Sequence, residues 1–274
     1  MKIKDILVHI DQQESSQARI DVAVKLAQAH DAHISGLYVI PDITIPSYAE
    51  VHVPAQLLAG YEQESRSTAD KAGEHFKQTL DRNGCKGEWI CTKGYADQQI
   101  RQFARYTDLV ILGQTRENSF LSTYADLPNQ VVIGSARPIM FVPYIGVRNT
   151  IGKRIMVAWN DSRESVRAVN DALPLLQIAD FVDVVAINPP ASMGDIPTAD
   201  ICLHLARHDV KAEASQTSAK DIEVGDMLLS RAADLDIDLI VTGAYGHTRL
   251  RELILGGVTK QLLEHMTVPI LMSH

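Results

Sequence analysis

An internal repeat constrains the fold of this chain more than any other feature of its sequence. Residues 108–113 read DLVILG and residues 238–243 read DLIVTG, so an apolar run that ends at glycine occurs twice. These two runs lie 130 residues apart, and Pro138 and Pro269 lie 131 residues apart. We therefore predict two units of the same fold, placed one after the other in the chain.

Each unit alternates short apolar runs, typical of buried strands, with segments of helical periodicity, and this alternation predicts α/β units with parallel sheets covered by helices on both faces. The first unit comprises residues 1–146 and the second residues 150–274. Strands are expected at 6–10, 34–40, 88–91, 109–112, 138–142, 154–158, 181–187, 210–214, 239–241 and 268–272. Helices are expected at 16–27, 55–82, 98–106, 129–135, 162–176, 196–208, 222–235 and from 258 onward.

The composition is that of an ordinary globular protein. The chain has 274 residues, 46% of them apolar, with a net charge of −8, so we expect no nucleic-acid partner. No apolar run approaches the about 18 residues that a membrane-spanning helix needs. The three cysteines form no disulfide or zinc pattern, and the N-terminus lacks the features of a signal peptide. We expect a cytoplasmic protein without a membrane partner.

The segment at residues 239–259 is the clearest candidate for a binding site. An apolar run is followed by Gly243 and Gly246, and the pair Gly256 and Gly257 precedes a new helical periodicity. A glycine-bearing loop between a strand and a helix start can direct backbone N–H groups at a phosphate. The alternative is that these glycines only form tight turns. The sequence contains no G-x-x-x-x-G-K-[ST] motif, so this is not a P-loop.

The spacing Gly243-x2-Gly246-x9-Gly256, followed by Val258 and Thr259, resembles the nucleotide-binding signature of the universal stress protein family. Gly257 stands where that family usually has serine or threonine. The resemblance extends over both units. It implies two tandem doubly wound modules of the Rossmann-like, adenine nucleotide alpha hydrolase-like type, each a five-stranded parallel sheet of order 3-2-1-4-5. Because last strands meet in dimers of the family, it also implies an intramolecular pseudo-dimer and is compatible with a homodimer of whole chains.

The resemblance further implies that the second unit binds ATP or another adenine nucleotide, with or without Mg²⁺. Asn160 takes the position of an aspartate that contacts the nucleoside in the family, and Asp161 follows it. Helix capping is the alternative role for both residues. The complete set of candidate binding residues is Asn160, Asp161, Gly243, Gly246, His247, Arg249, Gly256, Gly257, Val258 and Thr259.

The first unit departs from the signature, and we predict that its phosphate loop is degenerate. Asp11 and Gly113 match the family pattern, but Arg116 replaces the second glycine. The third glycine falls near Ala125 and Asp126, where a carboxylate would repel phosphate. We therefore expect one nucleotide for each chain.

No residue pattern indicates a catalytic group or a metal site. His204 and His208 have the i, i+4 spacing that can hold a metal, but the sequence offers no third ligand, and we interpret them as an exposed pair. We predict a stress-response protein that acts through nucleotide binding, with at most slow ATP hydrolysis. The alternative is a scaffold or signalling partner that binds no nucleotide and carries a relaxed site.

Overall fold

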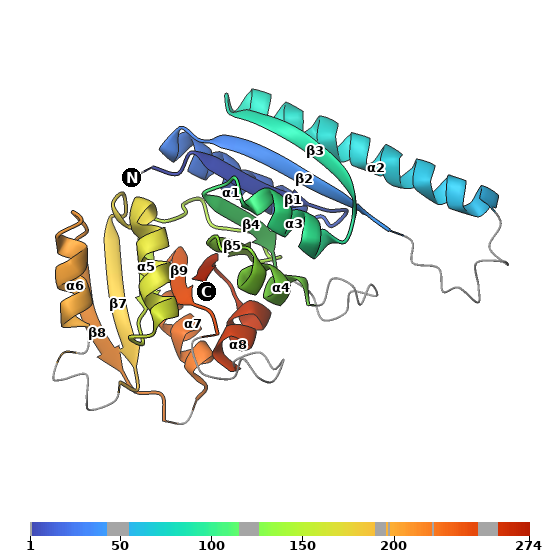
Figure 1. Ribbon diagram of the computed structural model, residues 1–274. Helices are drawn as coiled ribbons and strands as arrows, with labels where there is room; N and C mark the ends of the chain where they lie inside the picture. Colours follow the sequence, from blue (N-terminus) through green and yellow to red (C-terminus); the bar gives the residue numbers. More distant parts are fainter. Residues whose placement is uncertain are drawn as a thin grey trace.

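The computed structural model describes residues 2–42, 55–114, 126–189, 196, 198–220, 222–245 and 257–274. Helices and strands alternate along the chain, as expected (Figure 1). The first unit contains β1 (Asp5–Ile10), α1 (Ser16–His30), β2 (His33–Pro41), α2 (Ala55–Arg82), β3 (Lys86–Gly94), α3 (Ala96–Ala104), β4 (Leu109–Gly113), α4 (Leu127–Gly134) and β5 (Ile139–Val142). The second contains β6 (Arg154–Ala158), α5 (Arg163–Leu176), β7 (Phe181–Ile187), α6 (Ala199–Ala206), β8 (Ala212–Thr217), α7 (Val224–Asp234), β9 (Leu239–Gly243), α8 (Gly257–His265) and β10 (Ile270–Ser273).

The strands form one sheet of ten, in the order β3-β2-β1-β4-β5-β10-β9-β6-β7-β8. Each half of this sheet has the order 3-2-1-4-5, with parallel pairing throughout. The α/β fold of two doubly wound modules is therefore confirmed. The repeat gives each unit the same sequence of strands and helices, and the two copies are joined edge to edge.

The join between the two halves is the antiparallel pairing of β5 with β10. Phe141 lies opposite Ile270, and Met140 lies opposite Leu271. All four side chains are at most 1% exposed. Because every other neighbour in the sheet is parallel, this antiparallel pair relates the halves by an approximate twofold axis. It also covers an apolar edge that each half would otherwise present to solvent.

Two apolar layers cover the two faces of the sheet. One contains buried side chains of α1, α2, α5 and α6, and the other contains those of α3, α4, α7 and α8. Strand residues alternate between the layers: Ile6 and Val8 belong to the first, and Leu7 belongs to the second. The continuous apolar runs of the central strands follow from this arrangement, because both of their faces are buried.

The largest differences from the sequence prediction lie at the two edge strands. β3 is longer than the expected strand at 88–91, and β8 begins at Ala212 and continues to Thr217. Both strands expose many of their side chains, since each has only one neighbouring strand. Because many of their residues are polar, the apolar runs that predict strands were short or absent in both. None of the helices in the part of the chain that the structure describes is long and apolar enough to cross a membrane.

Candidate functional site

The two candidate crevices lie where the order of the strands reverses, between β1 and β4 in the first half and between β6 and β9 in the second. Ligands of open α/β sheets bind outside the carboxyl ends of the strands at such a point. In the first half these ends carry Asp11 and Gly113, and in the second half they carry Asn160 and Gly243. The residues that the sequence indicated therefore lie at this edge of the sheet in both units, and their role in binding stays a prediction.

The strand registers allow the two crevices to be compared residue by residue. Ile6 pairs with Leu109 in the first half, as Ile155 pairs with Leu239 in the second. This correspondence equates the following residues of the two halves: His9 with Ala158, Asp11 with Asn160, Ser16 with Ser165, and Arg19 with Ala168. The charged pair of the first half is thus replaced as a whole by a neutral pair in the second.

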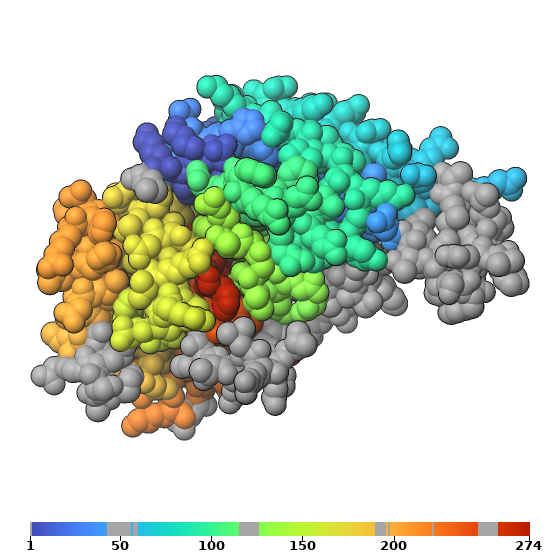
Figure 2. Space-filling model, viewed as in Figure 1, coloured from blue at the N-terminus to red at the C-terminus, as the bar shows by residue number. Residues whose placement is uncertain are grey.

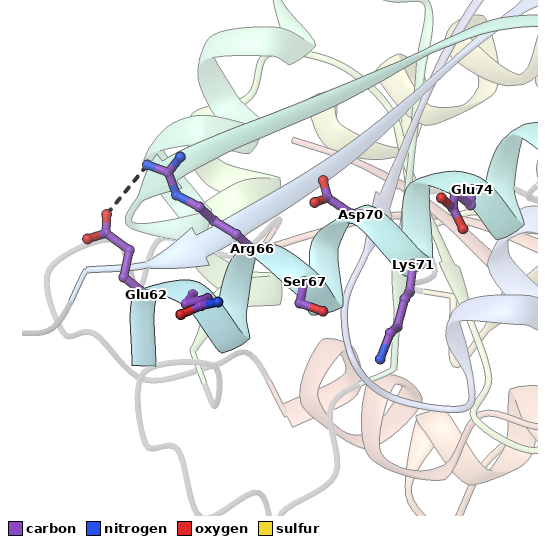
Figure 3. Close-up of a pocket in the computed structure, with 7 residues that line it drawn as sticks. Glu62, Arg66, Ser67, Asp70, Lys71 and Glu74 are labelled. Atoms are coloured by element: carbon purple, nitrogen blue, oxygen red, sulfur yellow. Dashed lines mark ion pairs between the residues drawn. The ribbon is translucent and has the colours of Figure 1, made fainter. Parts of the chain in front are cut away.

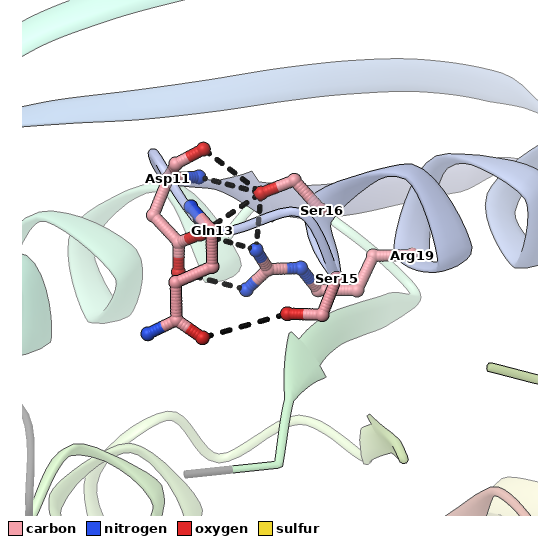
Figure 4. Close-up of polar contacts among 5 residues, drawn as sticks. All are labelled: Asp11, Gln13, Ser15, Ser16 and Arg19. Carbon is pink, nitrogen blue, oxygen red and sulfur yellow. Dashed lines mark hydrogen bonds and ion pairs between the residues drawn. The ribbon is translucent and has the colours of Figure 1, made fainter. Parts of the chain in front are cut away.

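A buried ion pair occupies the first crevice (Figure 4). The guanidinium of Arg19 donates to both carboxylate oxygens of Asp11, at 2.6 and 3.1 Å. It also donates to the hydroxyl of Ser16, which itself donates to the Asp11 side chain at 2.9 Å. Arg19 is only 2% exposed. The sequence did not indicate Arg19 as a site residue. Its counterpart in the second half is Ala168, so an arginine is not needed at this position to form the helix.

Gly113 provides the space for this arginine. A Cβ atom at Gly113 would lie 2.8 Å from Nη1 of Arg19. The guanidinium therefore lies directly against the end of β4, at the position where the crevice would otherwise open. Little space remains there, in a small cavity lined by Asp11, Arg19, Gly113 and Gln114 among others.

The ionisable groups of the first crevice have strongly shifted pKa values. Burial tends to raise the pKa of Asp11, but the charge and hydrogen bonds of Arg19 outweigh burial and lower it to about 2. Burial lowers the pKa of His9 to about 4, with Asp11 opposing this shift and Arg19 adding to it. His9 is therefore neutral at pH 7, and Asp11 is ionised.

We expect His9 to make the protein sensitive to mild acid. Its pKa is lower in the folded state, so between the unfolded value of 6.5 and the folded value of about 4 the unfolded chain binds more protons. This histidine should therefore stabilise the fold fully above pH 6.5, and about 3 kcal/mol should be lost on acidification to pH 4. Urea unfolding of wild type and His9→Gln between pH 7 and pH 4 measures the difference in slope.

If His9→Gln and wild type lost stability in parallel over this range, the buried neutral state of His9 would be contradicted.

The second crevice has a different polar arrangement at the end of β6. Asn160 is exposed, and its Oδ1 accepts hydrogen bonds from the backbone N–H of Ser162 at 3.2 Å and from its hydroxyl at 2.7 Å. Ser162 in turn caps α5 by accepting from the backbone N–H of Ser165 at 3.2 Å. Asn160 thus takes part in the capping of α5, which leaves both roles considered for it from the sequence compatible with the structure. Asp161 is exposed and has a positive φ of 59°.

Gly243 ends β9 in close contact with the start of α5. A Cβ atom here would lie 2.6 Å from the backbone carbon of Glu164 and 2.6 Å from the backbone nitrogen of Ser165. Both of these are main-chain atoms, so they cannot move aside as a flexible side chain can. A glycine is therefore required at this position by packing, whatever its part in ligand binding.

The start of α8 completes the described part of the second crevice. α8 leads into β10, which is parallel to β9, so its N-terminus lies at the same edge of the sheet as Gly243. Gly257, Val258 and Thr259 form its first turn, whose backbone N–H groups have no partner within the helix. The remaining candidate residues, Gly246, His247, Arg249 and Gly256, lie outside the described residues.

Two other polar features do not converge on a ligand position. A shallow hollow along α2 is lined by side chains of mixed charge, among them Glu62 and Arg66, which form an ion pair at 3.6 Å (Figure 3). The ring of His204, in α6, and the ring of His208, in the turn that follows α6, have centroids 4.7 Å apart. Among the described residues, no group of three or more metal-ligating side chains comes together.

The strand order and the parallel pairing within each half define a doubly wound α/β protein, a class of fold in which ligands bind outside the carboxyl ends of the strands where the strand order reverses. The model of the universal stress protein family matches residues 2–142 and again residues 152–274, and this chain belongs to that family as a tandem of two modules.

A curated universal stress protein of Synechocystis sp. is 24% identical over 203 residues, which cover 71% of this chain and 68% of that protein. The crystal structure of a universal stress protein from Archaeoglobus fulgidus has a TM-score of 0.77 at 16% identity and covers 100% of this chain and 99% of its own. Two less similar structures, a universal stress protein in complex with cAMP and a family member from Arabidopsis thaliana with AMP bound, cover about half of this chain with TM-scores of 0.40 and 0.37.

Proposed function

We propose that this chain binds ATP or another adenine nucleotide in its second module, at one site for each chain, and acts through that binding in a cytoplasmic stress response. The difference between the two crevices is the observation that supports this proposal. In the first, Arg19 fills the space beside Gly113 and neutralises Asp11. In the second, Ala168 and Asn160 take these positions, and among the described residues Gly243 lies against main-chain atoms at the start of α5 where Gly113 lies against a guanidinium.

The proposed roles of the binding residues follow from their positions. Asn160 and Asp161, at the end of β6, contact the base or the ribose. The N-terminus of α8, with Gly257, Val258 and Thr259, offers backbone N–H groups and the hydroxyl of Thr259 to the phosphates. From the sequence, Gly246, His247, Arg249 and Gly256 complete the phosphate site, and Mg²⁺ accompanies a triphosphate. We assign no catalytic residue, so the expected activity is binding, with slow hydrolysis at most.

Calorimetric titration of ATP into the full chain tests this proposal, with an expected stoichiometry of one. The sharpest variant transfers the ion pair of the first module into the second, as Asn160→Asp combined with Ala168→Arg. If the arginine closes the second crevice as Arg19 closes the first, ATP affinity should fall at least 100-fold while the variant remains folded by circular dichroism.

The single substitution Asn160→Asp is the matched control, because it restores the aspartate that the family has at this position without adding the arginine. It should bind ATP at least as well as wild type. A stoichiometry of two, or unchanged binding by the double variant, would contradict the proposal. Absence of binding by the folded wild type would favour the alternative of a scaffold or signalling partner, in which Asn160 serves only to cap α5.

We also propose that the two modules act as an intramolecular counterpart of a dimer of single modules. The continuous pairing of β5 with β10 supports this assembly. Further hydrogen bonds join the two halves on either side of this strand pair. Gln114 donates to the carbonyl of Glu264 at 2.8 Å, and Arg167 donates to the carbonyl of Ala136 at 2.8 Å. In Figure 2 the C-terminal segment, in red, lies between the surfaces of the α5 and α4 segments.

A further inference from the structure

We propose that Asn129 of the first module is a positioning residue for the nucleotide site of the second, and that it acts through Tyr245. This inference rests on the proposed function for its effect on nucleotide binding. The hydroxyl of Tyr245 donates a hydrogen bond to Oδ1 of Asn129, across the junction of the two modules. Tyr245 follows Gly243 by two residues and directly precedes residues 246–256, which carry most of the expected phosphate contacts.

Asn129 is itself held in place by Asp126. The Nδ2 group of Asn129 donates to one carboxylate oxygen of Asp126 at 2.7 Å, and Gln130 donates to the other at 3.0 Å. With its amide nitrogen engaged in this way, the amide oxygen of Asn129 faces Tyr245. Asp126 takes the position of Gly257 in the repeat, by the spacing of Pro138 and Pro269. The acid that spoils the phosphate loop of the first module thus orients a group that serves the second.

The backbone of Tyr245 needs external contacts to hold its conformation. Its φ is 64°, a left-handed value that is unfavourable for a side chain of this size. One contact of Tyr245 itself and two of the neighbouring Ala244 hold this strand end within the second module. The ring of His274 meets the tyrosine ring edge-on, with centroids 6.0 Å apart, and Nδ1 of His274 lies 3.0 Å from the carbonyl oxygen of Ala244. The backbone N–H of Ala244 donates to the carbonyl of Ser273 at 2.9 Å.

Together with the hydrogen bond from Tyr245 to Asn129, these contacts come from both modules. Ser273 and His274 fix the end of β9 from within the second module, whereas Asn129 fixes the tyrosine side chain from α4 of the first. Burial, and then the charge of Asp126, raises the pKa of Tyr245, so the phenol retains the proton that it donates. The direction in which the chain leaves β9 toward the phosphate loop therefore depends on a residue outside the module that contains the site.

The experiment compares three substitutions in the full chain. Tyr245→Phe removes only the hydroxyl, and Asn129→Leu removes its acceptor with little change in size. Gln130→Ala is the matched control, because it alters the neighbouring residue of α4, whose side chain donates to Asp126 and takes no part in the hydrogen bond between Tyr245 and Asn129. We expect the first two to weaken ATP binding about tenfold and Gln130→Ala to change it less than twofold.

Two further measurements separate positioning from general loss of structure. Adenosine, which has no phosphate, should bind all variants and wild type within twofold of one another. The double variant should bind ATP no more weakly than either single variant, since both remove the same hydrogen bond. Equal losses for adenosine and ATP, or additive losses in the double variant, would overturn the proposal.

Amide hydrogen exchange at Ala244 and Tyr245 provides a readout that does not depend on the nucleotide. Exchange should be at least tenfold faster in Tyr245→Phe and Asn129→Leu than in wild type or Gln130→Ala. If wild type bound no ATP, the proposed function would fail, and faster exchange alone would support the anchoring of this strand end by Asn129. Unchanged exchange in both variants would overturn the inference whatever the result with ATP.

Discussion

Replacing Gly243 by alanine is expected to lower the free energy of unfolding by about 3 kcal/mol or more. The new methyl group would lie 2.6 Å from two backbone atoms at the start of α5. This distance is far below van der Waals contact, and the obstacle is main chain at the capped end of a helix. Either β9 or α5 must therefore move, and both contribute buried side chains to the sheet and its apolar layers. The same movement should open the second crevice and weaken the ATP binding that we propose for it.

Alanine substitutions at two other glycines should give a graded series of changes in the free energy of unfolding, which urea or guanidinium unfolding measures. At Gly113 an added Cβ meets Arg19 Nη1 at 2.8 Å, which is the end of a long side chain, so Gly113→Ala should cost less than Gly243→Ala. At Gly60, in α2, nothing lies within 4 Å of the added atom, and alanine should stabilise the helix by about 0.5–1 kcal/mol. A value for Gly243→Ala within about 1 kcal/mol of wild type would show that the contact between β9 and α5 is not tight.

The repeat explains why so much of the fold could be predicted from the sequence. Two matching apolar runs ending at Gly113 and Gly243 identified the central strands, and the alternation of strands with helices required parallel sheets. Edge strands were predicted less well. β8 exposes residues such as Glu213 and Gln216, so burial on one side only left a weak apolar signal. Which edges pair was expected from the family resemblance, and not from the residues themselves.

The sequence indicated part of what the structure shows at the candidate site, whose role in binding stays a prediction. It placed Asn160 and Gly243 after the carboxyl ends of their strands, because strand ends can be recognised from apolar runs that stop at polar residues or glycine. It did not reveal Arg19, since an arginine on a helix usually faces water, and only comparison with Ala168 marks this position as different. The contact of Tyr245 with Asn129 joins residues 116 positions apart, and neither residue carries a local signal for it.

Replacing Arg19 by alanine is expected to be strongly destabilising, by about 3–5 kcal/mol at pH 7. The carboxylate of Asp11 would lose its ion pair while its side chain stayed only 21% exposed. The shorter side chain would also leave a space beside Gly113. Since the pKa of Asp11 is lowered chiefly by Arg19, against the opposing effect of burial, the stabilisation is complete above the ordinary aspartate range. It is lost as the pH falls toward about 2, so the cost of Arg19→Ala should be smaller at pH 3 than at pH 7.

The second module supplies the compensating change for this experiment. Adding Asp11→Asn to Arg19→Ala reproduces the neutral combination of Asn160 and Ala168, which the same strand and helix accommodate in the other half. With no buried charge left unpaired, the double variant should recover about 2 kcal/mol relative to Arg19→Ala alone, as measured in a double-mutant cycle of urea unfolding. If Arg19→Ala cost less than about 1 kcal/mol, or Asp11→Asn made it less stable still, the ion pair would not be what closes and stabilises the first crevice.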